Sequence, residues 1–502
     1  MSGKYTVRLE PHGKVLKAGS GTPLLDLLPG YGIEFPCGGN GTCFNCKIRI
    51  LKGDMETAAE YKVLLKQKGF DPEWRLACKS IINQDVTLEV FSSDALILAD
   101  NTPFAFTASA GYGIAIDLGT TTLVAHLLDL STGHVTDAVT AVNKQSPYGA
   151  DIMSRISYAL NPAGHAKLCG LIRGQLGLII QDMIARNGCV PRKIVMVGNT
   201  VMHHLFSGID VTSLAQFPFT TTKGEKKTFR ATELGWKLPE AAEIIFMPVA
   251  GGFIGSDLVA GIMATGMDNS DDLVVFIDLG TNGEIAVGNR YRILAASTAA
   301  GPAFEGMQIS QGMRAVTGAV SSVYSDGNKL GIHVIGNVSP RGICGSGLID
   351  AVAVMMAAGK ISESGQLVSL HEDIAITRSI KLTQKDIYEF VLAKAAIASG
   401  IHILLSLLNK SYHDVKKVFI AGGFGYFITV SNAIQVGLLE FPEKKIVKAG
   451  NTALIGAKML LVREENAETE ILNKLNQIPL ESRPEFKDVF IQKMTLKKSD
   501  LF

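Results

Sequence analysis

Four cysteines near the start of the chain have the spacing of a metal-cluster site. They form the pattern C-x5-C-x2-C followed, after 31 further residues, by a fourth cysteine, and they are Cys37, Cys43, Cys46 and Cys78. Four thiolates can hold a [2Fe–2S] cluster, and the loop's glycines let it wrap closely. A four-cysteine zinc site is the rival interpretation, but zinc ribbons usually carry two C-x2-C pairs and this chain has one. The spacing therefore favours the iron–sulfur cluster.

Two turns combine a carboxylate, a glycine and hydroxyl groups after an apolar run. They are IDLGTTT at 116–122 and FIDLGTNGE at 276–284. Such turns can cradle phosphate, and their aspartates can hold Mg²⁺ through water, although each aspartate could also merely cap its turn. Because there are two, we expect them to clamp the phosphates of a nucleotide from both sides. The candidate residues are Asp117, Gly119, Thr120, Thr121 and Thr122 in the first turn, and Asp278, Gly280, Thr281, Asn282 and Gly283 in the second.

A third glycine turn follows the expected strand at 418–421. It contains Gly422, Gly423 and Phe424, and glycine has no side chain to block an adenosine moiety. We expect this turn to border the adenosine of ATP, although Phe424 also suits a hydrophobic core. The sequence contains neither a GxxxxGK[ST] loop nor a GxGxxG turn, which argues against P-loop and Rossmann proteins.

Composition narrows the function classes. The chain has 502 residues, 47% of them hydrophobic, and a formal net charge of +1, so nothing favours a nucleic-acid or membrane-surface partner. The N-terminus lacks the apolar segment of a signal peptide, and we expect a cytoplasmic protein. The most apolar long stretch, 390–408, contains Lys394 and His402, which predicts a buried helix and no membrane span.

Patterning predicts the elements that position these residues. We expect a cluster domain at 1–93, a linker at 94–111 that docks on a surface, one lobe at 112–270, and a second lobe with a C-terminal segment at 271–502. The linker lacks a sustained period, whereas both lobes alternate buried strands with helices. Helices rich in small residues near 256–266 and 452–457 would permit the close packing that a hinge between lobes needs. A long amphipathic helix is expected at 166–187.

Two resemblances follow from these motifs. The cysteine pattern and Arg75-Leu76-Ala77-Cys78 resemble the ferredoxin family, which implies a β-grasp [2Fe–2S] domain. The order of two phosphate turns, two hinge helices and one Gly-Gly turn resembles the superfamily of actin, sugar kinases and heat-shock chaperone ATPases (ASKHA, ribonuclease H-like). That implies a two-lobed α/β ATPase over residues 112 to about 462. Relatives place a water-orienting acid where Asp257 stands.

Other stretches have no counterpart in kinases or chaperones. They are YGAD at 148–151, STAAGPAFEG at 297–306 and GICGSGLID at 342–350. Together with a ferredoxin domain, they make the chain resemble the reductive activators of corrinoid enzymes in anaerobic methyl-transfer pathways. The resemblance implies ATP-dependent reduction of Co(II) to Co(I) on a partner corrinoid protein of a methyltransferase or O-demethylase system. It also implies an upstream electron donor and a homodimer, and it gives Asp151 and Glu305 no role.

The chain departs from the family pattern in two ways, and two other functions are possible alternatives. Residues 94–111 leave no room for the middle domain of some family members, and no cysteine follows Cys344 to form a second cluster. One alternative is an ATP-driven electron donor like the activators of hydroxyacyl-CoA dehydratases, which hold a cluster at a dimer seam. Another is a non-catalytic, redox-gated nucleotide-binding protein. A sugar kinase is disfavoured because nothing in the chain indicates a sugar site.

Overall fold

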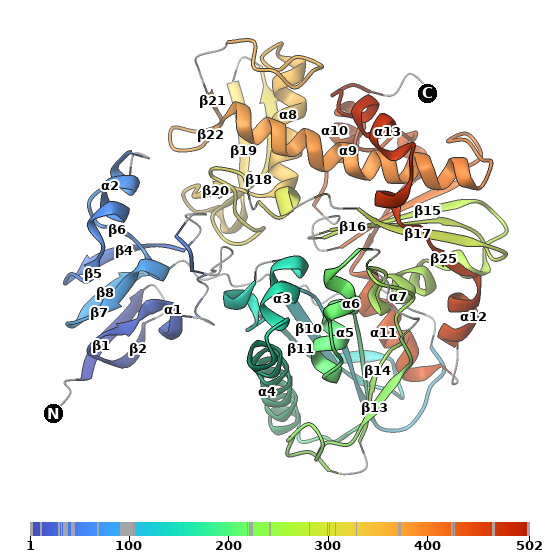
Figure 1. Cartoon of the computed structure of the whole chain (residues 1–502), viewed down its shortest axis with the longest axis horizontal. Coiled ribbons are helices and arrows are strands. Elements are labelled where there is room, and N and C mark those ends of the chain that lie inside the picture. Colours follow the sequence, from blue (N-terminus) through green and yellow to red (C-terminus); the bar gives the residue numbers. More distant parts are fainter. Residues whose placement is uncertain are drawn as a thin grey trace.

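The computed structural model shows a small N-terminal domain beside two larger lobes (Figure 1). It describes residues 4–498 except 11–12, 29–30, 32, 34–38, 42–45, 68–69, 91–103, 105, 150, 218, 220–223, 240–241, 281, 299, 301, 307, 328, 370–372, 423–424, 426 and 464–466. Five predicted site residues therefore lie outside the described residues, as does most of the predicted linker. These five are Cys37, Cys43, Thr281, Gly423 and Phe424.

The N-terminal domain is built on a five-stranded mixed sheet. Its strand order is β2 (Lys14–Gly19), β1 (Lys4–Glu10), β8 (Val86–Glu89), β4 (Lys47–Lys52) and β6 (Trp74–Leu76). Strands β1 and β2 form an antiparallel pair, whereas β1 and β8 run parallel. Alternation along β1 turns Val7 and Leu9 inward, where both are fully buried. The domain therefore has a hydrophobic core of its own.

Short elements complete this domain. Helices α1 (Leu24–Leu27) and α2 (Ala59–Gln67) belong to this domain, and α2 packs against β6. A three-stranded sheet joins β3 (Thr22–Pro23), β7 (Ser80–Ile82) and β5 (Glu56–Thr57). The single turn η1 (Ala77–Lys79) carries Cys78 between β6 and β7.

Lobe I contains a six-stranded sheet. Its order is β11 (His134–Val142), β10 (Thr122–Asp129), β9 (Tyr112–Leu118), β12 (Pro191–Gly198), β14 (Glu243–Phe246) and β13 (Lys227–Phe229). The first three strands form an antiparallel meander, and β12 and β14 then add in parallel to β9. The first phosphate turn is the β9–β10 hairpin, at the end of the central strand.

Lobe II repeats this arrangement. Its order, read in the same direction, is β25 (Leu475–Gln477), β17 (Ile293–Thr298), β16 (Gly283–Gly288), β15 (Val274–Leu279), β23 (Lys417–Ala421) and β24 (Ile446–Gly450). Again a three-stranded antiparallel meander is followed by two parallel strands. The second phosphate turn is the β15–β16 hairpin, equivalent to the first. The predicted fold class, a β-grasp domain followed by a two-lobed ASKHA ATPase, is confirmed.

Two long helices cover the sheets. Helix α4 (Pro162–Asn187) begins four residues before the predicted start because Asn161 caps it and Pro162 occupies its first turn. Helix α9 (Gln384–Leu407) begins with a capping box of Thr383 and Asp386. Both are long and apolar enough to cross a membrane by length and composition alone, but 78% of the most apolar window of α9 is buried in the protein. Such burial is typical of a core helix.

Helices α7 (Ser256–Thr265) and α11 (Thr452–Val462) pack together between the lobes. Although α11 is late in the chain, it lies beside α7 of lobe I (Figure 1). A Cβ atom on Gly456 would stand 2.2 Å from the backbone oxygen of Ala260, and one on Gly261 would stand 2.5 Å from the ring of Phe276. The small residues are therefore needed for the close approach of these helices, as predicted for a hinge.

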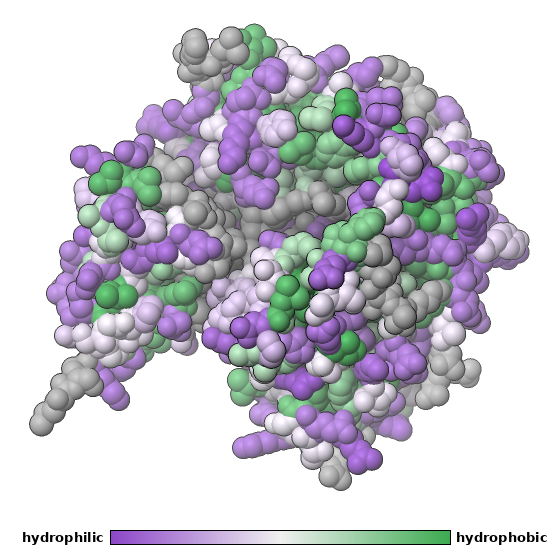
Figure 2. Space-filling view, viewed as in Figure 1, coloured by the Kyte–Doolittle hydropathy of each residue, from purple (hydrophilic) through white to green (hydrophobic). Residues whose placement is uncertain are grey.

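Further elements extend both lobes. A small sheet, β19 (Lys329–Val334), β18 (Ala319–Asp326) and β20 (Gly342–Ile343), packs against α8 (Gly345–Ala357) at the edge of lobe II nearer the N-terminal domain (Figure 1). Other helices are α3 (Ile152–Ala159), α5 (Thr200–Ser207) and α10 (Val430–Gln435). The C-terminal helices are α12 (Ala467–Lys474) and α13 (Phe486–Lys493). Figure 2 shows hydrophilic and hydrophobic residues interspersed over the face viewed, with a notch between the N-terminal domain and lobe I.

Candidate functional site

The first phosphate turn is held in shape by lobe I. Gly119 N–H donates to the Thr122 carbonyl at 3.1 Å and closes the turn. A Cβ atom on Gly119 would stand 2.5 Å from that same carbonyl oxygen, so only glycine fits. Asn199, the N-cap of α5, donates from Nδ2 to the Thr120 hydroxyl at 2.8 Å. The turn is therefore fixed before any ligand binds.

Four carboxyl groups converge between the lobes. Asp117 lies near the end of β9, Asp257 in the first turn of α7, Asp278 near the end of β15 and Glu284 near the start of β16. Asp278 is close enough to feel the charges of both Asp117 and Asp257, and Glu284 feels those of Asp257 and Asp278. The structure thus brings together the three acids that the sequence indicated. It adds Glu284, which was visible at the end of the second turn but to which we gave no role.

Burial is the main cause of the unusual protonation of these acids. It raises the pKa of Asp117 from 3.8 to about 6, against a lowering by the Asn451 amide. Burial and then the charges of Asp257 and Asp117 raise the pKa of Asp278 to about 7. The pKa values of Asp257 and Glu284 are raised for the same reasons, burial first and neighbouring carboxylates second.

Buried carboxylates that repel one another favour a cation in their midst. Among the residues that the structure describes, no three acid, histidine or cysteine side chains form a direct ligand shell for one metal ion. A set of acids that forms no direct shell would suit Mg²⁺ held partly through water, with its remaining ligands supplied by phosphate oxygens. The acids therefore fit a magnesium–nucleotide complex better than a bare ion.

The second phosphate turn and the adenosine turn are neighbours. Gly280 N–H donates to the Asn282 carbonyl at 3.0 Å, which closes the second turn as Gly119 closes the first. Gly422, at the end of β23, has a φ of +88°, and a Cβ atom there would stand 2.6 Å from Asp278 Oδ1. The glycine that begins the predicted adenosine turn therefore abuts Asp278, one of the two aspartates predicted to hold Mg²⁺. Among the described residues, Gly422, Asp278 and Asp117 therefore lie near one another at the two predicted phosphate turns.

A carboxylate of lobe II, that of Glu305, reaches the first phosphate turn. The Thr121 hydroxyl donates to Glu305 Oε2 at 3.5 Å, at the long limit of a hydrogen bond. Glu305 ends the short turn η4 (Pro302–Glu305), inside the stretch that had no counterpart in kinases. A carboxylate therefore faces the place where we expect phosphates.

Two of the four cluster cysteines are described, and they lie side by side. The Sγ atoms of Cys46 and Cys78 are 3.3 Å apart, and Ala77 N–H donates to the Cys46 carbonyl at 2.9 Å. Tyr61 and Lys79 lie against Gly41 of the cysteine loop, where a Cβ atom would stand 2.7 Å and 2.8 Å from them. Two converging thiols beside a loop that admits only glycine at this position fit the expected ligand set of a [2Fe–2S] cluster.

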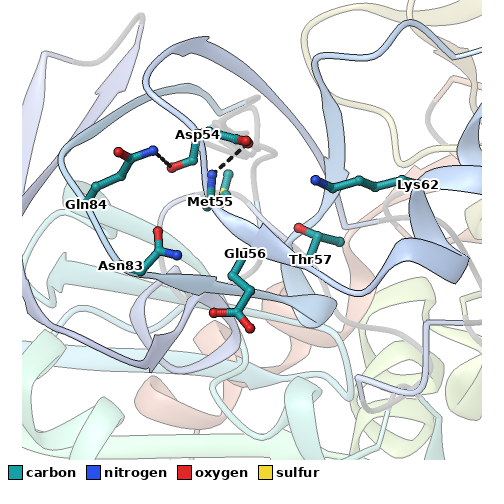
Figure 3. Close-up of a pocket in the computed structure, with 7 residues that line it drawn as sticks. All are labelled: Asp54, Met55, Glu56, Thr57, Lys62, Asn83 and Gln84. Atoms are coloured by element: carbon teal, nitrogen blue, oxygen red, sulfur yellow. Dashed lines mark hydrogen bonds between the residues drawn. The ribbon is translucent and has the colours of Figure 1, made fainter.

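A separate pocket of about 260 Å³ lies on the N-terminal domain (Figure 3). Asp54 organises it, because Met55 N–H donates to its carboxylate at 2.8 Å and Gln84 Nε2 to its carbonyl at 2.9 Å. The pocket shares no residue with the cysteines or with the interlobe acids. It is therefore not part of either candidate site.

Three family models match the chain. The 2Fe-2S iron–sulfur cluster binding domain matches residues 7–83, the RACo middle region matches 112–270, and the C-terminal ASKHA domain of RACo matches 272–502. A solved structure of a reductive activator for corrinoid,iron-sulfur protein superposes with a TM-score of 0.70 and 27% identity, covering 99% of both chains.

The chain belongs to the family of reductive activators of corrinoid proteins. Curated relatives of this family carry matching names. The chain is 34% identical over 387 residues to the corrinoid activation enzyme RamQ of Eubacterium limosum, an alignment that spans 71% of this chain and 65% of RamQ. It is 27% identical over 394 residues to the [Co(II) methylated amine-specific corrinoid protein] reductase of Methanosarcina barkeri, across 72% of each.

Proposed function

We propose that the protein uses ATP to drive the one-electron reduction of Co(II) to Co(I) on a partner corrinoid protein. The observation that carries the proposal is the cluster of buried acids from both lobes, on a chain that also contains a ferredoxin domain. The names of the relatives support a corrinoid protein as the electron acceptor. A chain that contains both an electron carrier and an ATPase domain suits an electron transfer that is too unfavourable to proceed unaided.

The residues divide the work between two sites. Cys37, Cys43, Cys46 and Cys78 would hold the [2Fe–2S] cluster, which supplies one electron at about −400 mV if it resembles plant-type clusters. Asp117 and Asp278 would hold Mg²⁺ through water, and the two phosphate turns would hold the phosphates. Gly422, Gly423 and Phe424 would border the adenosine.

Asp257 would orient the water that attacks the terminal phosphate. Its pKa is raised to about 7 by burial and by Asp117, so it can accept a proton near neutral pH. The products are ADP and phosphate, and the released free energy must appear as a difference between two lobe arrangements to drive electron transfer. Closure about the α7–α11 hinge is the motion that the fold offers.

The proposal also covers the domains of the chain, its partners and its location. We propose the domain division 1–93, 94–111, 112–270 and 271–502, an upstream electron donor, a homodimer and a cytoplasmic location. The alternative of a second cluster at a dimer seam would need Cys344. That thiol is only 2% exposed and donates a hydrogen bond to the Val320 carbonyl at 3.4 Å, which weighs against the alternative.

An anaerobic assay tests the proposal. The reduced protein is mixed with a Co(II) corrinoid protein, with and without Mg–ATP, and the Co(I) absorbance is followed. We expect Co(I) only with Mg–ATP, and none with a Cys78→Ala variant. Absence of ATP-dependent Co(I) formation with every corrinoid partner tried would refute it. Nucleotide binding without hydrolysis would instead favour a redox-gated binding protein.

A further inference from the structure

We propose that Arg155 is a positioning residue for the phosphates of ATP, and that the 143–155 segment exists to aim the first phosphate turn. This inference rests on the proposed binding of ATP between the lobes. It also gives a purpose to YGAD at 148–151, a stretch that kinases and chaperones lack.

Arg155 lies on α3 and is completely buried. Its guanidinium donates from Nε to the Gly149 carbonyl at 2.9 Å and from Nη1 to Gln145 Oε1 at 3.1 Å. Its other terminal nitrogen, Nη2, donates to the Thr120 carbonyl of the first phosphate turn. One side chain thus connects the 145–149 segment to the phosphate turn.

The sequence builds this position locally. Asp151 caps α3 by accepting from Ser154 N–H at 2.9 Å, in a reciprocal capping box. A Cβ atom on Gly149 would stand 2.6 Å from the backbone nitrogen of Arg155, so glycine is needed where the chain enters the helix. The cap and the glycine together place Arg155 beneath the phosphate turn.

The charge of Arg155 has no close counterion among the described residues. Its hydrogen-bond acceptors are uncharged groups, and the carboxylates of Asp151 and Glu305 act on it only at longer range. Burial and then the nearby charge of Arg314 lower its pKa to about 9. A buried, incompletely compensated cation is costly, and an arriving anion would remove that cost.

The backbone of the turn shows where that anion would bind. Arg155 holds the Thr120 carbonyl, and Asn143 Nδ2 holds the Gly119 carbonyl at 3.0 Å. In a trans peptide the carbonyl and the following N–H point in opposite directions. The N–H groups of Thr120 and Thr121 are therefore aimed away from Arg155 and Asn143. Thr120 is only 5% exposed, and its N–H donates to no acceptor among the described residues.

A buried N–H without an acceptor and a cation behind it describe an oxyanion site. Phosphate oxygens would accept from the turn, while the guanidinium stabilises their charge from the opposite side of the peptide. The contribution of Arg155 to nucleotide affinity should increase with the number of phosphates, and its contribution to binding of the adenosine should be small.

The test compares nucleotides in Arg155→Met and Arg155→Lys variants. Dissociation constants for ATP, ADP and AMP are measured by calorimetry with Mg²⁺ on the full-length protein. Loss of charge-assisted hydrogen bonds should weaken ATP binding by about 10- to 100-fold in Arg155→Met. AMP binding should change by less than about threefold, and Arg155→Lys, which keeps the charge without the planar fork, should lie between.

The matched control is Arg173→Met on α4. Arg173 also donates to a backbone carbonyl, that of Phe206 at 2.7 Å, but this carbonyl belongs to the last turn of α5 and not to the phosphate turn. It should leave every nucleotide affinity unchanged. If Arg155→Met fails to fold, the test rests on Arg155→Lys, through the ratio of its dissociation constants for ATP and AMP. An unchanged ratio in the folded Arg155 variants overturns the inference, whereas wild-type protein that binds no ATP overturns the proposed function instead.

Discussion

Asn451 of lobe II donates a hydrogen bond from Nδ2 to Oδ2 of Asp117 of lobe I, at 2.9 Å. The other side of the same amide accepts from Leu454 N–H at 2.9 Å and caps the hinge helix α11. Asp117, which we propose holds Mg²⁺, and the start of the proposed hinge helix are therefore joined through one side chain. A change in the charge of Asp117 would be felt directly at the cap.

Asn451→Ala should weaken both functions of this amide. Loss of the cap should cost about 1 kcal/mol of stability. Loss of the hydrogen bond should raise the pKa of Asp117 further and so weaken Mg–ATP binding near neutral pH, because that bond now lowers the pKa. Chemical denaturation and calorimetry measure the two effects.

Asn161→Ala is the control for the cap. Asn161 caps α4 by accepting from Ala163 N–H at 2.9 Å, on an exposed surface. It should cost similar stability and leave Mg–ATP binding intact. Equal nucleotide affinities in the two variants would contradict a role for Asn451 beyond capping.

Mg–ATP binding should strengthen as pH rises. Asp117 and Asp278 have pKa values of about 6 and about 7, so both are largely protonated at pH 5, and Mg²⁺ must displace those protons. We expect the affinity to rise at least about tenfold between pH 5.5 and pH 8. Calorimetry in buffers of different ionisation enthalpy would show proton release, and Asp278→Asn should reduce it. A flat or falling affinity would be inconsistent with these protonation states.

The stability of the protein without Mg–ATP should fall as pH rises, whereas its affinity for Mg–ATP should increase. A carboxyl whose pKa is raised above its ordinary 3.8 binds more protons in the folded than in the unfolded state. Stability without Mg²⁺ should therefore fall as pH rises through 6 and 7. The melting temperature of wild-type protein, compared with Asp278→Asn, measures this. If the melting temperature of the wild-type protein rises over this pH range while that of Asp278→Asn does not, the assigned protonation states are wrong.

Glu305→Gln should tighten ATP binding several-fold. The Glu305 carboxylate reaches the Thr121 hydroxyl from the opposite lobe, where it would repel incoming phosphates. Glutamine keeps the shape and removes the charge. Glu481→Gln, an exposed change in the same lobe, should have no effect. Weaker ATP binding in Glu305→Gln would show that the carboxylate assists the nucleotide.

Single cysteine changes should separate ligands from bystanders. Cys46→Ala and Cys78→Ala should each abolish the visible spectrum of the cluster, because their thiols adjoin at 3.3 Å. Cys43→Ala should do the same by the spacing argument. Cys169→Ala is the control, since Cys169 is a buried residue of α4. A cluster spectrum that survives the loss of Cys43 would show that the ligand set is wrong.

The sequence predicted the fold well where short patterns decide it. Glycine, aspartate and hydroxyl groups at the β9–β10 and β15–β16 hairpins revealed a duplicated lobe, because these turns tolerate few other residues. The cysteine spacing likewise indicated the ferredoxin domain. The start of α4 was predicted four residues too late, since the Asn161–Pro162 cap was not recognised.

Interactions between distant residues were not predictable in this way. Asn451 and Asp117 are 334 positions apart, and Thr121 and Glu305 are 184 apart. No local pattern connects such pairs before the lobes are assembled. Arg155 was equally hidden, since a single arginine on a helix normally faces solvent. Its burial was evident only from the packing of α3 against the phosphate turn.

The most direct test records both ends of the electron transfer at once. Reduced protein is mixed in a stopped-flow instrument with a Co(II) corrinoid protein, and cluster oxidation and Co(I) formation are followed together. If ATP drives the transfer, both signals should appear at one rate, in a ratio of one electron per cobalt, and only with Mg–ATP. Co(I) that forms equally well without nucleotide, or while the cluster stays reduced, would contradict it.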